Sequence, residues 1–335
     1  MATVKDLANR TGLGLATISK YLNGGHVLER NKIAIEKAIE ELDFTVNEFA
    51  RGLKVGRSHT IGVIIPELSN VFITSIITVV EDFLRKKGYG VIICDCRTNE
   101  EQEAESVRFL VSKMVDGIIN MPVCREGTHL QPALEKNIPV VLIDRMISDL
   151  KGQVNAVLVD NVRASSSAVL ELIQAGHKHI GIILGPKDIF TSQQRRLGYQ
   201  QAFIENNLMP DESLTVFSDY TVQGGYESMN RLLDRPDISA VFVTNYEMTL
   251  GAMIAANERG IKIPEQLSFI GFDNLQLSQV IRPKLTIVTQ PLEEIGKQTA
   301  EILLEQLVKE PNQRKTKIVT LSASVQLGES VQKYE

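Results

Sequence analysis

From Thr60 onward, short runs of apolar residues alternate with longer amphipathic segments. Runs of four or five apolar residues in a row are typical of parallel strands that are buried on both faces. We predict strands at 61–65, 91–94, 117–120, 140–143, 157–159, 180–184, 240–243, 267–271 and 285–288. Segments of helical length and pattern lie between them, for example 72–87, 101–113, 164–175, 199–206 and 248–259. This alternation predicts an α/β fold of doubly wound parallel sheets, and about ten strands favour two lobes over one sheet.

The first sixty residues show a different pattern, that of short helices. Thr3 followed by Asp6 forms a potential capping box, and apolar residues then recur at helical spacing. The segment 11–14 interrupts this pattern, 15–22 resumes it, and Asn23-Gly24-Gly25 ends it. A third helix is predicted from about Arg30 to Leu42.

The spacing within residues 3–23 fits a helix-turn-helix. Ala8 is small where two helices would touch, Gly12 allows a positive φ in the turn, and Ile18 points back into a shared core. Spacing alone fits any short helical hairpin about equally well. In a helix-turn-helix, the second helix would present Leu15, Ala16, Ser19 and Lys20 to the major groove.

The chemistry of that second helix suits DNA. Leu15 and Ala16 fit thymine methyl groups, and Lys20 can donate to guanine, whereas a solvated surface lysine is the alternative for Lys20. The residues better placed for phosphates are Thr17, Asn23 and His26.

Composition agrees with a soluble chain of 335 residues, 43% of them hydrophobic and 23% charged. No apolar run approaches the roughly 18 residues of a membrane helix, and the N-terminus has no secretory pattern, so we expect a cytoplasmic protein. The net charge of −5 alone argues against nucleic acid. However, residues 1–59 hold nine Lys/Arg and seven Asp/Glu, a balance of +2 that leaves −7 for the remainder. A mildly basic head on an acidic body fits a small nucleic-acid module.

Few residues suggest catalysis or metal binding. The three cysteines, Cys94, Cys96 and Cys124, exclude a disulfide framework and lack a second pair for zinc, so the first two are assigned to packing. His177 and His179 flank a lysine before a strand and are not expected to be catalytic or metal ligands. No nucleophile elbow, P-loop or GxGxxG occurs, and we predict no cofactor, no metal and no enzyme activity.

Several segments together resemble the lactose/galactose repressor (LacI/GalR) family of bacterial transcription regulators. They are TVKDLA and ATISKYLN near the N-terminus, NEFARGL, TIGVIIP, VDGII, AGHKHI, RRLGY, IGFDN and PKLTIVTQ, in the family's order over nearly the whole chain. The resemblance implies an N-terminal all-α helix-turn-helix head with a hinge helix, on an α/β core like periplasmic binding proteins. It also implies a sensor of sugars or nucleobases.

For DNA binding, the resemblance places Leu15, Ala16 and Lys20 at base-reading positions. The family usually has Arg at Lys20 and Ser at Gly14, so the operator is expected to differ from the commonest family site. Residues 47–54 match the hinge helix, whose Leu53 would wedge into the minor groove. We expect this short helix to fold only on DNA beside a partner subunit, and Val46 replaces the family's preceding proline. The further contacts implied are Thr3, Asn47, Ala50 and Lys54.

For the ligand, polar residues just after the strands are the candidates, because open α/β sheets bind ligands at that edge. A polyhydroxyl ligand needs carboxylates, Arg or amide partners and an aromatic platform. The candidates are Asn70, Phe72, Asp144, Arg145, Phe190, Thr191, Arg195, Tyr220, Asn245, Asp273 and Gln290. The resemblance strengthens Arg195, Asn245 and Asp273, while structural roles are equally open for Asp144, Arg145, Phe190 and Tyr220. Tyr246 stands where the family typically has aspartate.

These expectations combine into an effector-controlled transcription regulator, a homodimer that binds operator DNA. Its parts would be a head at 1–45, a hinge and linker at 46–59, and a core at 60–335. The DNA-proximal lobe would comprise about 60–160 and 291–318, the distal lobe about 161–289 and 319–335, with crossovers near Asp160, Gln290 and Thr320. The alternatives are a transport-type sugar-binding protein, an enzyme acting on a small sugar, and a regulator with a protein co-repressor.

Overall fold

The computed structural model describes residues 2–22, 24–44, 57–273 and 275–334, without the side chains of 275–277. The chain divides into two compact units, Met1–His59 and Thr60–Glu335, and each is described by itself. The predicted hinge helix at 47–54 and Asn23 lie outside the described residues. None of the described helices is long and apolar enough to cross a membrane.

The described part of the first unit forms three helices, α1 (Val4–Thr11), α2 (Leu15–Leu22) and α3 (Glu29–Glu41). Their core consists of Leu7, Ile18, Ile35, Ala38 and Phe44, with Ala8 packed against it. The roles predicted for Ile18 and Ala8 are therefore confirmed. The third helix begins and ends one residue earlier than predicted.

Local chemistry explains both ends of α1. The Asp6 amide donates to the Thr3 hydroxyl at 3.4 Å, and the Thr3 amide donates to the Asp6 carboxylate at 2.7 Å, which completes the capping box. Gly12 follows the helix at φ 68°, and its amide donates to the Ala8 carbonyl. A Cβ at Gly12 would meet nothing within 4 Å, so the backbone angle alone favours glycine there.

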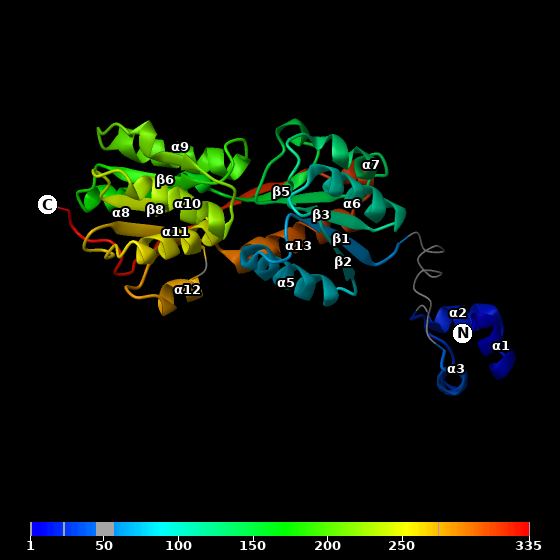
Figure 1. Ribbon diagram of the computed structural model, residues 1–335. Helices are drawn as coiled ribbons and strands as arrows, with labels where there is room; N and C mark the ends of the chain where they lie inside the picture. The colour runs from blue at the N-terminus through cyan, green and yellow to red at the C-terminus, as the bar shows by residue number, and fades with distance from the viewer. Residues whose placement is uncertain (1, 23, 45–56, 274, 335) are drawn as a thin grey trace. The chain divides into compact units, whose positions relative to one another are not determined.

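The second unit contains two six-stranded sheets (Figure 1). The first has the order β11-β5-β4-β3-β1-β2 and the second β12-β10-β9-β8-β6-β7. The strands of the first are β1 (Thr60–Ile65), β2 (Gly90–Asp95), β3 (Gly117–Asn120), β4 (Val140–Ile143), β5 (Asn155–Val159) and β11 (Ile318–Leu321). Those of the second are β6 (Ile180–Leu184), β7 (Thr215–Phe217), β8 (Ala240–Val243), β9 (Ser268–Phe272), β10 (Thr286–Thr289) and β12 (Ser324–Gln326). All pairings are parallel except β10 with β12.

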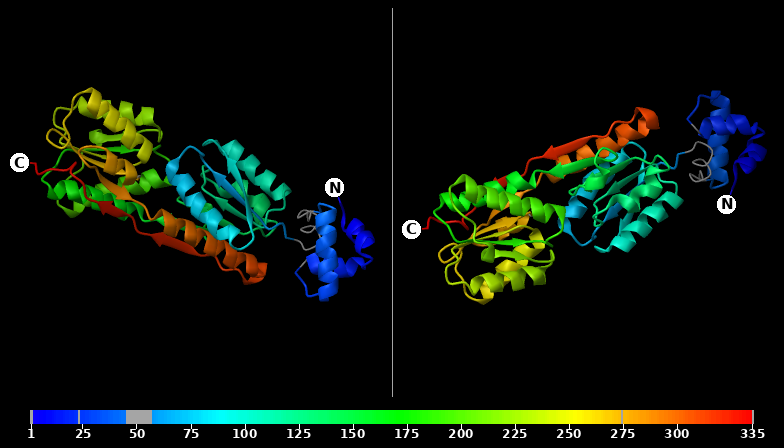
Figure 2. Two further views of the ribbon diagram at one scale, coloured as in Figure 1. Left: turned by 90° about the horizontal axis from the view of Figure 1, so that it is seen from below. Right: turned by 90° about the horizontal axis from the view of Figure 1, so that it is seen from above.

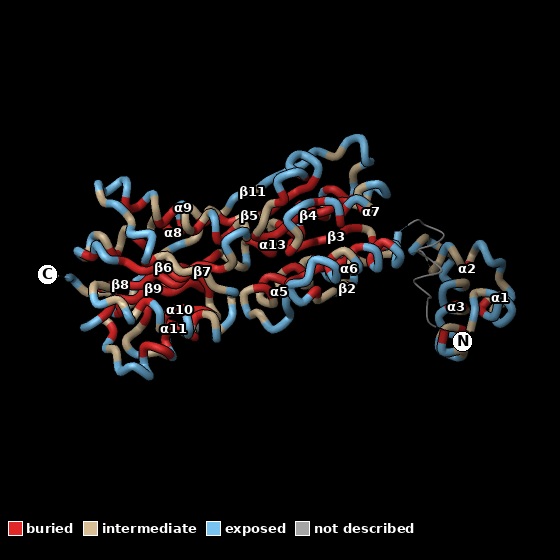
Figure 3. Tube along the Cα trace, turned by 45° about the horizontal axis from the view of Figure 1, so that its top comes forward, coloured by how far each residue is buried: buried red, intermediate tan, exposed pale blue. Residues whose placement is uncertain are grey.

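Each sheet carries helices on both faces, and its inner strands form the buried layer (Figures 2 and 3). On the first sheet α5 (Val71–Arg85) and α13 (Leu292–Val308) pack together, and α6 (Glu100–Ser112), η1 (Gly127–Leu130) and α7 (Gln131–Leu134) cover the other face. On the second, α8 (Asn161–Gln174) and α9 (Phe190–Glu205) form one layer. The other layer is α10 (Val222–Leu233) with α11 (Tyr246–Glu258). The remaining short helices are η2 (Ser148–Leu150), η3 (Glu212–Leu214), α12 (Leu275–Val280) and η4 (Pro311–Gln313).

The predicted doubly wound α/β class is confirmed. Each of the nine predicted apolar runs forms a strand, with ends that differ by at most two residues. Prediction missed β7, β11 and β12, which lie at sheet edges and are not fully buried, so they lack a continuous apolar run.

The chain crosses between the lobes at 159–161, 289–292 and 321–324. The expected boundary after residue 318 is therefore misplaced, because all of Ile318–Leu321 pairs with β5 of the first sheet. Without the terminal edge strands, each order reads 2-1-3-4-5. In that topology the ligand crevice lies where the winding reverses, at the carboxyl ends of β1 and β3, and of β6 and β8.

Candidate functional site

Helix α2 has one buried and one exposed side. Ile18 is buried, whereas Leu15 is 48% exposed and Ala16 and Lys20 are also exposed. Thr17 and Ser19 are half-buried. An exposed leucine and an exposed lysine on one short helix are side chains that fit a thymine methyl and a guanine edge.

The other predicted DNA contacts are placed only in part. Thr3 and His26 are exposed, and the Thr3 hydroxyl donates to Asp6 at 2.7 Å within the cap of α1. Asn23, Asn47, Ala50, Leu53 and Lys54 lie outside the described residues, so their contacts stay predictions.

At the carboxyl edge of the first sheet, Asp144 follows β4 and is 7% exposed. Its Oδ2 lies 3.5 Å from Nε of Arg145, whereas its Oδ1 has no hydrogen-bond partner among the described residues. Arg145 donates from Nη1 to the Pro122 carbonyl at 3.1 Å, and its guanidinium stands 6.0 Å from the ring centroid of Tyr220. Tyr220 belongs to the second lobe, so these groups face each other across the two lobes.

At the carboxyl edge of the second sheet, Asp273 follows β9 and Gln290 follows β10. The Gln290 amide donates to both Asp273 carboxylate oxygens, at 2.9 and 3.1 Å. The Gln290 Oε1 is buried and has no hydrogen-bond partner within the described residues. Burial raises the pKa of Asp273 to about 7, although the Arg195 charge and the Gln290 hydrogen bond oppose the shift. This carboxyl therefore titrates near neutrality.

Arg195 is held rigidly inside the second lobe. It is 4% exposed, donates from Nε to Asn161 Oδ1 at 2.8 Å, and also donates to the Thr244 carbonyl. Its guanidinium carbon lies 4.0 Å from the centroid of the Phe272 ring. A guanidinium fixed in this way is preorganised to bind an oxygen-rich ligand.

Glu247 links the two lobes, and sequence reasoning missed it. Its carboxylate accepts from Nδ2 of Asn70 in the first lobe at 2.8 Å and from Nδ2 of Asn245 in the second. Both asparagines cap helices: Asn70 accepts from the Ile73 amide and Asn245 from the Met248 amide. Burial raises the pKa of Glu247. Its position in the first turn of α11 was the available signal, two residues after the predicted Asn245.

The aromatic candidates differ in placement. The Tyr220 hydroxyl bonds Thr191 at 3.0 Å and Ser192 at 2.7 Å, so it lies at the start of α9. Phe190 is the half-buried first residue of that helix, and Phe72 packs partly against the core of the first lobe. The structure thus brings Tyr220, Thr191 and Arg145 together. Phe72, in contrast, packs in part against the core of the first lobe.

The cysteines that we assigned to packing take that role, and His177 has a structural one. Cys96 is buried in the core of the first lobe, and Cys94 packs against it. His177 is buried between the hydroxyls of Ser239 and Ser268, each at 2.9 Å, and burial lowers its pKa. Its imidazole joins strand ends of the second sheet.

Comparisons with known proteins agree with this architecture. Residues 169–331 match the family model of the periplasmic binding protein-like domain. Catabolite control protein A of Priestia megaterium is 33% identical over 311 residues, covering 92% of this chain and 93% of that protein. The transcriptional repressor CytR of Escherichia coli K12 is 34% identical over 313 residues, covering 91% and 90%.

Two solved structures extend the likeness. The complex of the transcriptional regulator CelR with cellobiose has a TM-score of 0.75 at 26% identity, covering 98% of this chain and 100% of that one. A LacI family transcriptional regulator from Enterococcus faecium with bound ribose has a TM-score of 0.73 at 27% identity, covering 82% and 100%.

A helix-turn-helix head on a bilobed core of the periplasmic binding type defines a DNA-binding transcription regulator with an effector-binding domain. The relatives, matched over nine-tenths of the chain, carry regulator names, and the transport alternative is not favoured. The chain belongs to the LacI family of transcription regulators.

Proposed function

We propose that this protein is a homodimeric repressor whose affinity for operator DNA is set by a sugar or related small metabolite bound between the two lobes of its core. The main support for an effector site is a set of buried polar atoms near the carboxyl ends of the strands in the two lobes. Asp144 Oδ1, Gln290 Oε1 and Arg145 Nε are buried without hydrogen-bond partners in the described part of the chain. Buried polar atoms normally have hydrogen-bond partners, so we infer that a bound ligand supplies the missing hydrogen bonds of these atoms.

The donor and acceptor types favour a polyhydroxyl ligand. Asp144 and Asp273 can accept from hydroxyls, Arg195 and Arg145 can donate, and Tyr220 offers an aromatic face. The similar proteins named above with cellobiose and with ribose bound support the same chemical class. We propose Asn70, Phe72, Phe190, Thr191, Asn245 and Gln290 as the other contacts.

The DNA-reading surface is proposed to be the exposed side of α2. In a dimer, two such helices related by a two-fold axis would read a near-palindromic operator. Leu15, Ala16 and Lys20 would contact bases, and Ser19 would face the major groove with them. Thr17, Asn23 and His26 would contact the phosphates of the DNA, and Thr3 would be a further contact. Residues 47–54 would form the hinge contacts. This function implies a cytoplasmic protein.

Control of the operator would come through the lobes. An effector that binds one arrangement of the lobes more tightly shifts the population toward it, and linkage requires the operator to change effector affinity by the same factor. We propose binding without turnover at this site. A protein co-repressor in place of a small molecule would give a regulator with no small-molecule response.

The DNA part is tested by fluorescence anisotropy with genomic fragments. A preferred fragment is expected, and Lys20→Ala should lower its advantage over random duplex by about 1–3 kcal/mol, or roughly 5- to 150-fold. Lys37→Ala on α3 removes the same charge from an exposed position outside α2 and should leave that advantage intact. If both variants lose the same share of the preference for the specific fragment, Lys20 contributes only general electrostatic attraction to DNA and does not read bases.

The effector part is tested by thermal-shift screening of the full chain against sugars, sugar phosphates and nucleobases. At 100 times its dissociation constant, a true effector adds about 2.7 kcal/mol of stability. That compound should also change operator affinity. A response to a nucleobase alone would replace the sugar proposal, and chemical conversion of the bound compound would revive the enzyme alternative.

A further inference from the structure

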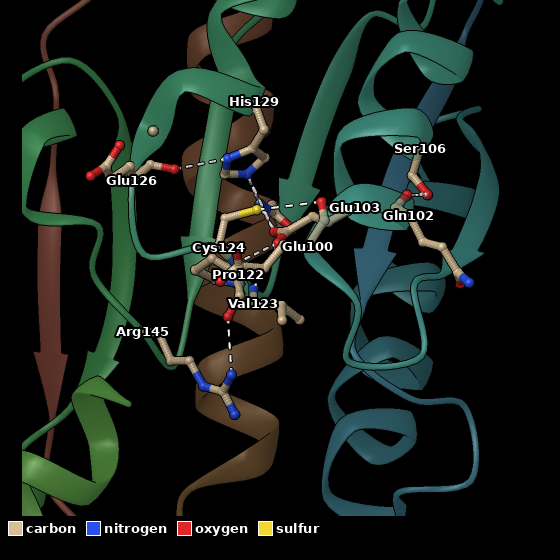
Figure 4. A network of polar contacts seen from close by, with 12 residues as sticks. Glu100, Gln102, Glu103, Ser106, Pro122, Val123, Cys124, Glu126, His129 and Arg145 are labelled. Carbon is tan, nitrogen blue, oxygen red and sulfur yellow. Dashed lines mark hydrogen bonds and ion pairs between the residues drawn. The ribbon is translucent and has the colours of Figure 1, made fainter. Parts of the chain in front are cut away.

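Three side chains with metal-binding donors meet in the first lobe, apart from the effector candidates (Figure 4). Glu103 comes from α6, Cys124 from the loop after β3, and His129 from η1. One donor atom of each lies within 4.8 Å of the other two. Glu103 is 0% exposed and His129 is 8% exposed, whereas Cys124 is half-buried and gives the cluster access to solvent.

The imidazole of His129 turns its Nε2 toward this cluster. Its Nδ1 lies 3.0 Å from the Glu126 carbonyl, which can only accept, so Nδ1 carries the proton. Its Nε2 lies 3.3 Å from Oε1 of Glu103 and becomes available to a metal ion when it carries no proton. A ring held by a carbonyl at one nitrogen, with the other aimed at acidic ligands, is the arrangement of metal-binding histidines.

The carboxylate of Glu103 is fixed in a similar way. Its Oε2 accepts from the amides of Val123 at 2.9 Å and Cys124 at 2.6 Å, which leaves Oε1 facing His129. Ligands about 2.0–2.1 Å from a tetrahedral zinc ion stand about 3.3 Å apart, so the separation of Oε1 and Nε2 suits an ion between them.

Asn120 supplies an independent observation. It is 0% exposed, and its Nδ2 lies 2.8 Å from Glu103 Oε1 and 3.3 Å from His129 Nε2. Its Oδ1 is buried with no hydrogen-bond partner in the described ranges. A flip of the Asn120 side-chain amide by about 180° would turn Oδ1 toward a cation. The oxygen without a hydrogen-bond partner would then be an additional metal ligand.

We propose that Glu103, Cys124 and His129 form a binding site for a transition-metal dication of the zinc class. One thiolate, one imidazole and one carboxylate favour Zn²⁺ or Co²⁺ over Mg²⁺ and Ca²⁺, which prefer oxygen ligands alone. On binding, the S–H bond of Cys124 breaks, the sulfur keeps the electron pair and coordinates the ion, and the proton goes to solvent. The thiol also gives up its contact with the Glu100 carbonyl, now at 3.6 Å. Three protein ligands leave a fourth position for Asn120 or water.

The loop that carries Cys124 also contacts both the effector candidates and the second lobe. The Pro122 carbonyl accepts from Arg145, and Arg125 pairs with Asp188 of the second lobe at 3.2 Å. A bound ion would hold residues 122–125 in this arrangement. The metal site itself does not depend on the proposed function, because its ligands are outside the effector set.

Cobalt titration of the full chain, freed of metal by a chelator, tests the proposal. We expect one Co²⁺ per chain and the ultraviolet charge-transfer band of a cobalt–thiolate bond. Cys124→Ser should abolish the band, whereas Cys94→Ser, at another half-buried cysteine of the same lobe, should retain it. Zn²⁺ should displace the cobalt and raise the unfolding temperature of the wild type but not of Cys124→Ser.

His129→Gln adds a check on the ligand set. Retention of the thiolate band with at least tenfold weaker cobalt affinity is expected, since one of three ligands is lost. A wild-type chain that binds no Co²⁺ or Zn²⁺ would overturn the proposal, and so would a band that survives Cys124→Ser. Circular dichroism of each variant confirms that it is folded, so that loss of the band reports on the ligand.

Discussion

Asp144 and Asp273 occupy equivalent places in the two lobes and differ in their surroundings. Each follows the fourth strand of a 2-1-3-4-5 sheet, at φ 67° and 61° respectively. Each backbone amide donates across to the next strand, Asp144 to Val157 and Asp273 to Val288. Asp144 has Arg145 beside it and one unpartnered oxygen in the described structure, whereas Gln290 binds both oxygens of Asp273.

The difference shows how one topology gives two kinds of carboxylate. The repeated strand order fixes where the acid stands, and the neighbouring side chains decide how it behaves. In the second lobe, an amide replaces the direct ion pair, and burial leaves the pKa of Asp273 at about 7. We therefore expect the second lobe to be the rigid and pH-sensitive half of the site, and the first lobe the half whose carboxylate keeps a free oxygen.

The largest effect that would test this comparison is expected at the arginines. Arg195→Ala leaves Asn161 Oδ1 and the Thr244 carbonyl without their buried donor, and should cost about 4 kcal/mol of unfolding free energy. Arg145→Ala removes a half-buried side chain that donates to the Pro122 carbonyl and pairs at 3.5 Å with Asp144, and should cost about 1 kcal/mol. Urea denaturation followed by circular dichroism measures both. Similar losses would contradict the view that the second lobe holds the rigid half.

A second effect, of the order of 4 kcal/mol, is expected in the pH dependence of stability. Asp273 has a folded pKa near 7 against a model value of 3.8, so the unfolded chain releases this proton first. Its contribution to stability is therefore full below about pH 4 and falls as the pH rises to about 7. The groups that face it are Arg195, Gln290, Asp144 and Glu247.

Asp273→Asn should remove that fall, so the variant gains stability relative to the wild type between about pH 4 and about pH 7. Asp144→Asn is the matched control at the equivalent position of the first lobe. Denaturation at a series of pH values gives the difference for each variant. A flat difference for Asp273→Asn would show that its carboxyl has the same pKa in the folded protein as in the unfolded chain.

The smallest effect concerns the link between the lobes. Asn70→Ala removes the cap of α5 and the hydrogen bond to Glu247, and should cost about 1 kcal/mol. Asn70→Asp keeps the capping oxygen but faces Glu247 with a second acid, which isolates the contact between lobes. In a double-mutant cycle with Glu247→Gln, coupling close to zero would remove this bond as a determinant of lobe arrangement.

Much of the fold was predictable because it rests on local patterns. Nine strands, all but β2 inside their sheets, were found from continuous apolar runs. The head was found from Thr3, Gly12 and Ile18, whose roles depend on neighbours a few residues away. The edge strands β7 and β12 were missed because three half-exposed residues carry no distinct pattern.

The site was predictable to a lesser degree. The rule that ligands meet the carboxyl ends of parallel strands located Asp144, Asp273 and Gln290, which are indeed buried at those ends. The rule does not say which side chains contact one another. Glu247 was therefore missed, and so was the contact between Glu103 and His129. Cys124 and Glu103 are 21 residues apart in the sequence, a separation with no metal-binding pattern.

The sequence by itself determined the order of elements, the class of fold and the family, since hydrophobic periodicity and turn residues act over short distances. The tertiary structure alone decided which polar groups lose their solvent and which partners replace it. Gln290 meets Asp273 because two neighbouring strands of the second sheet end at one edge, and Asn70 meets Glu247 because the two lobes come together there. Charge, pKa and ligand preference depend on such neighbours, because electrostatic interactions strengthen where water is excluded.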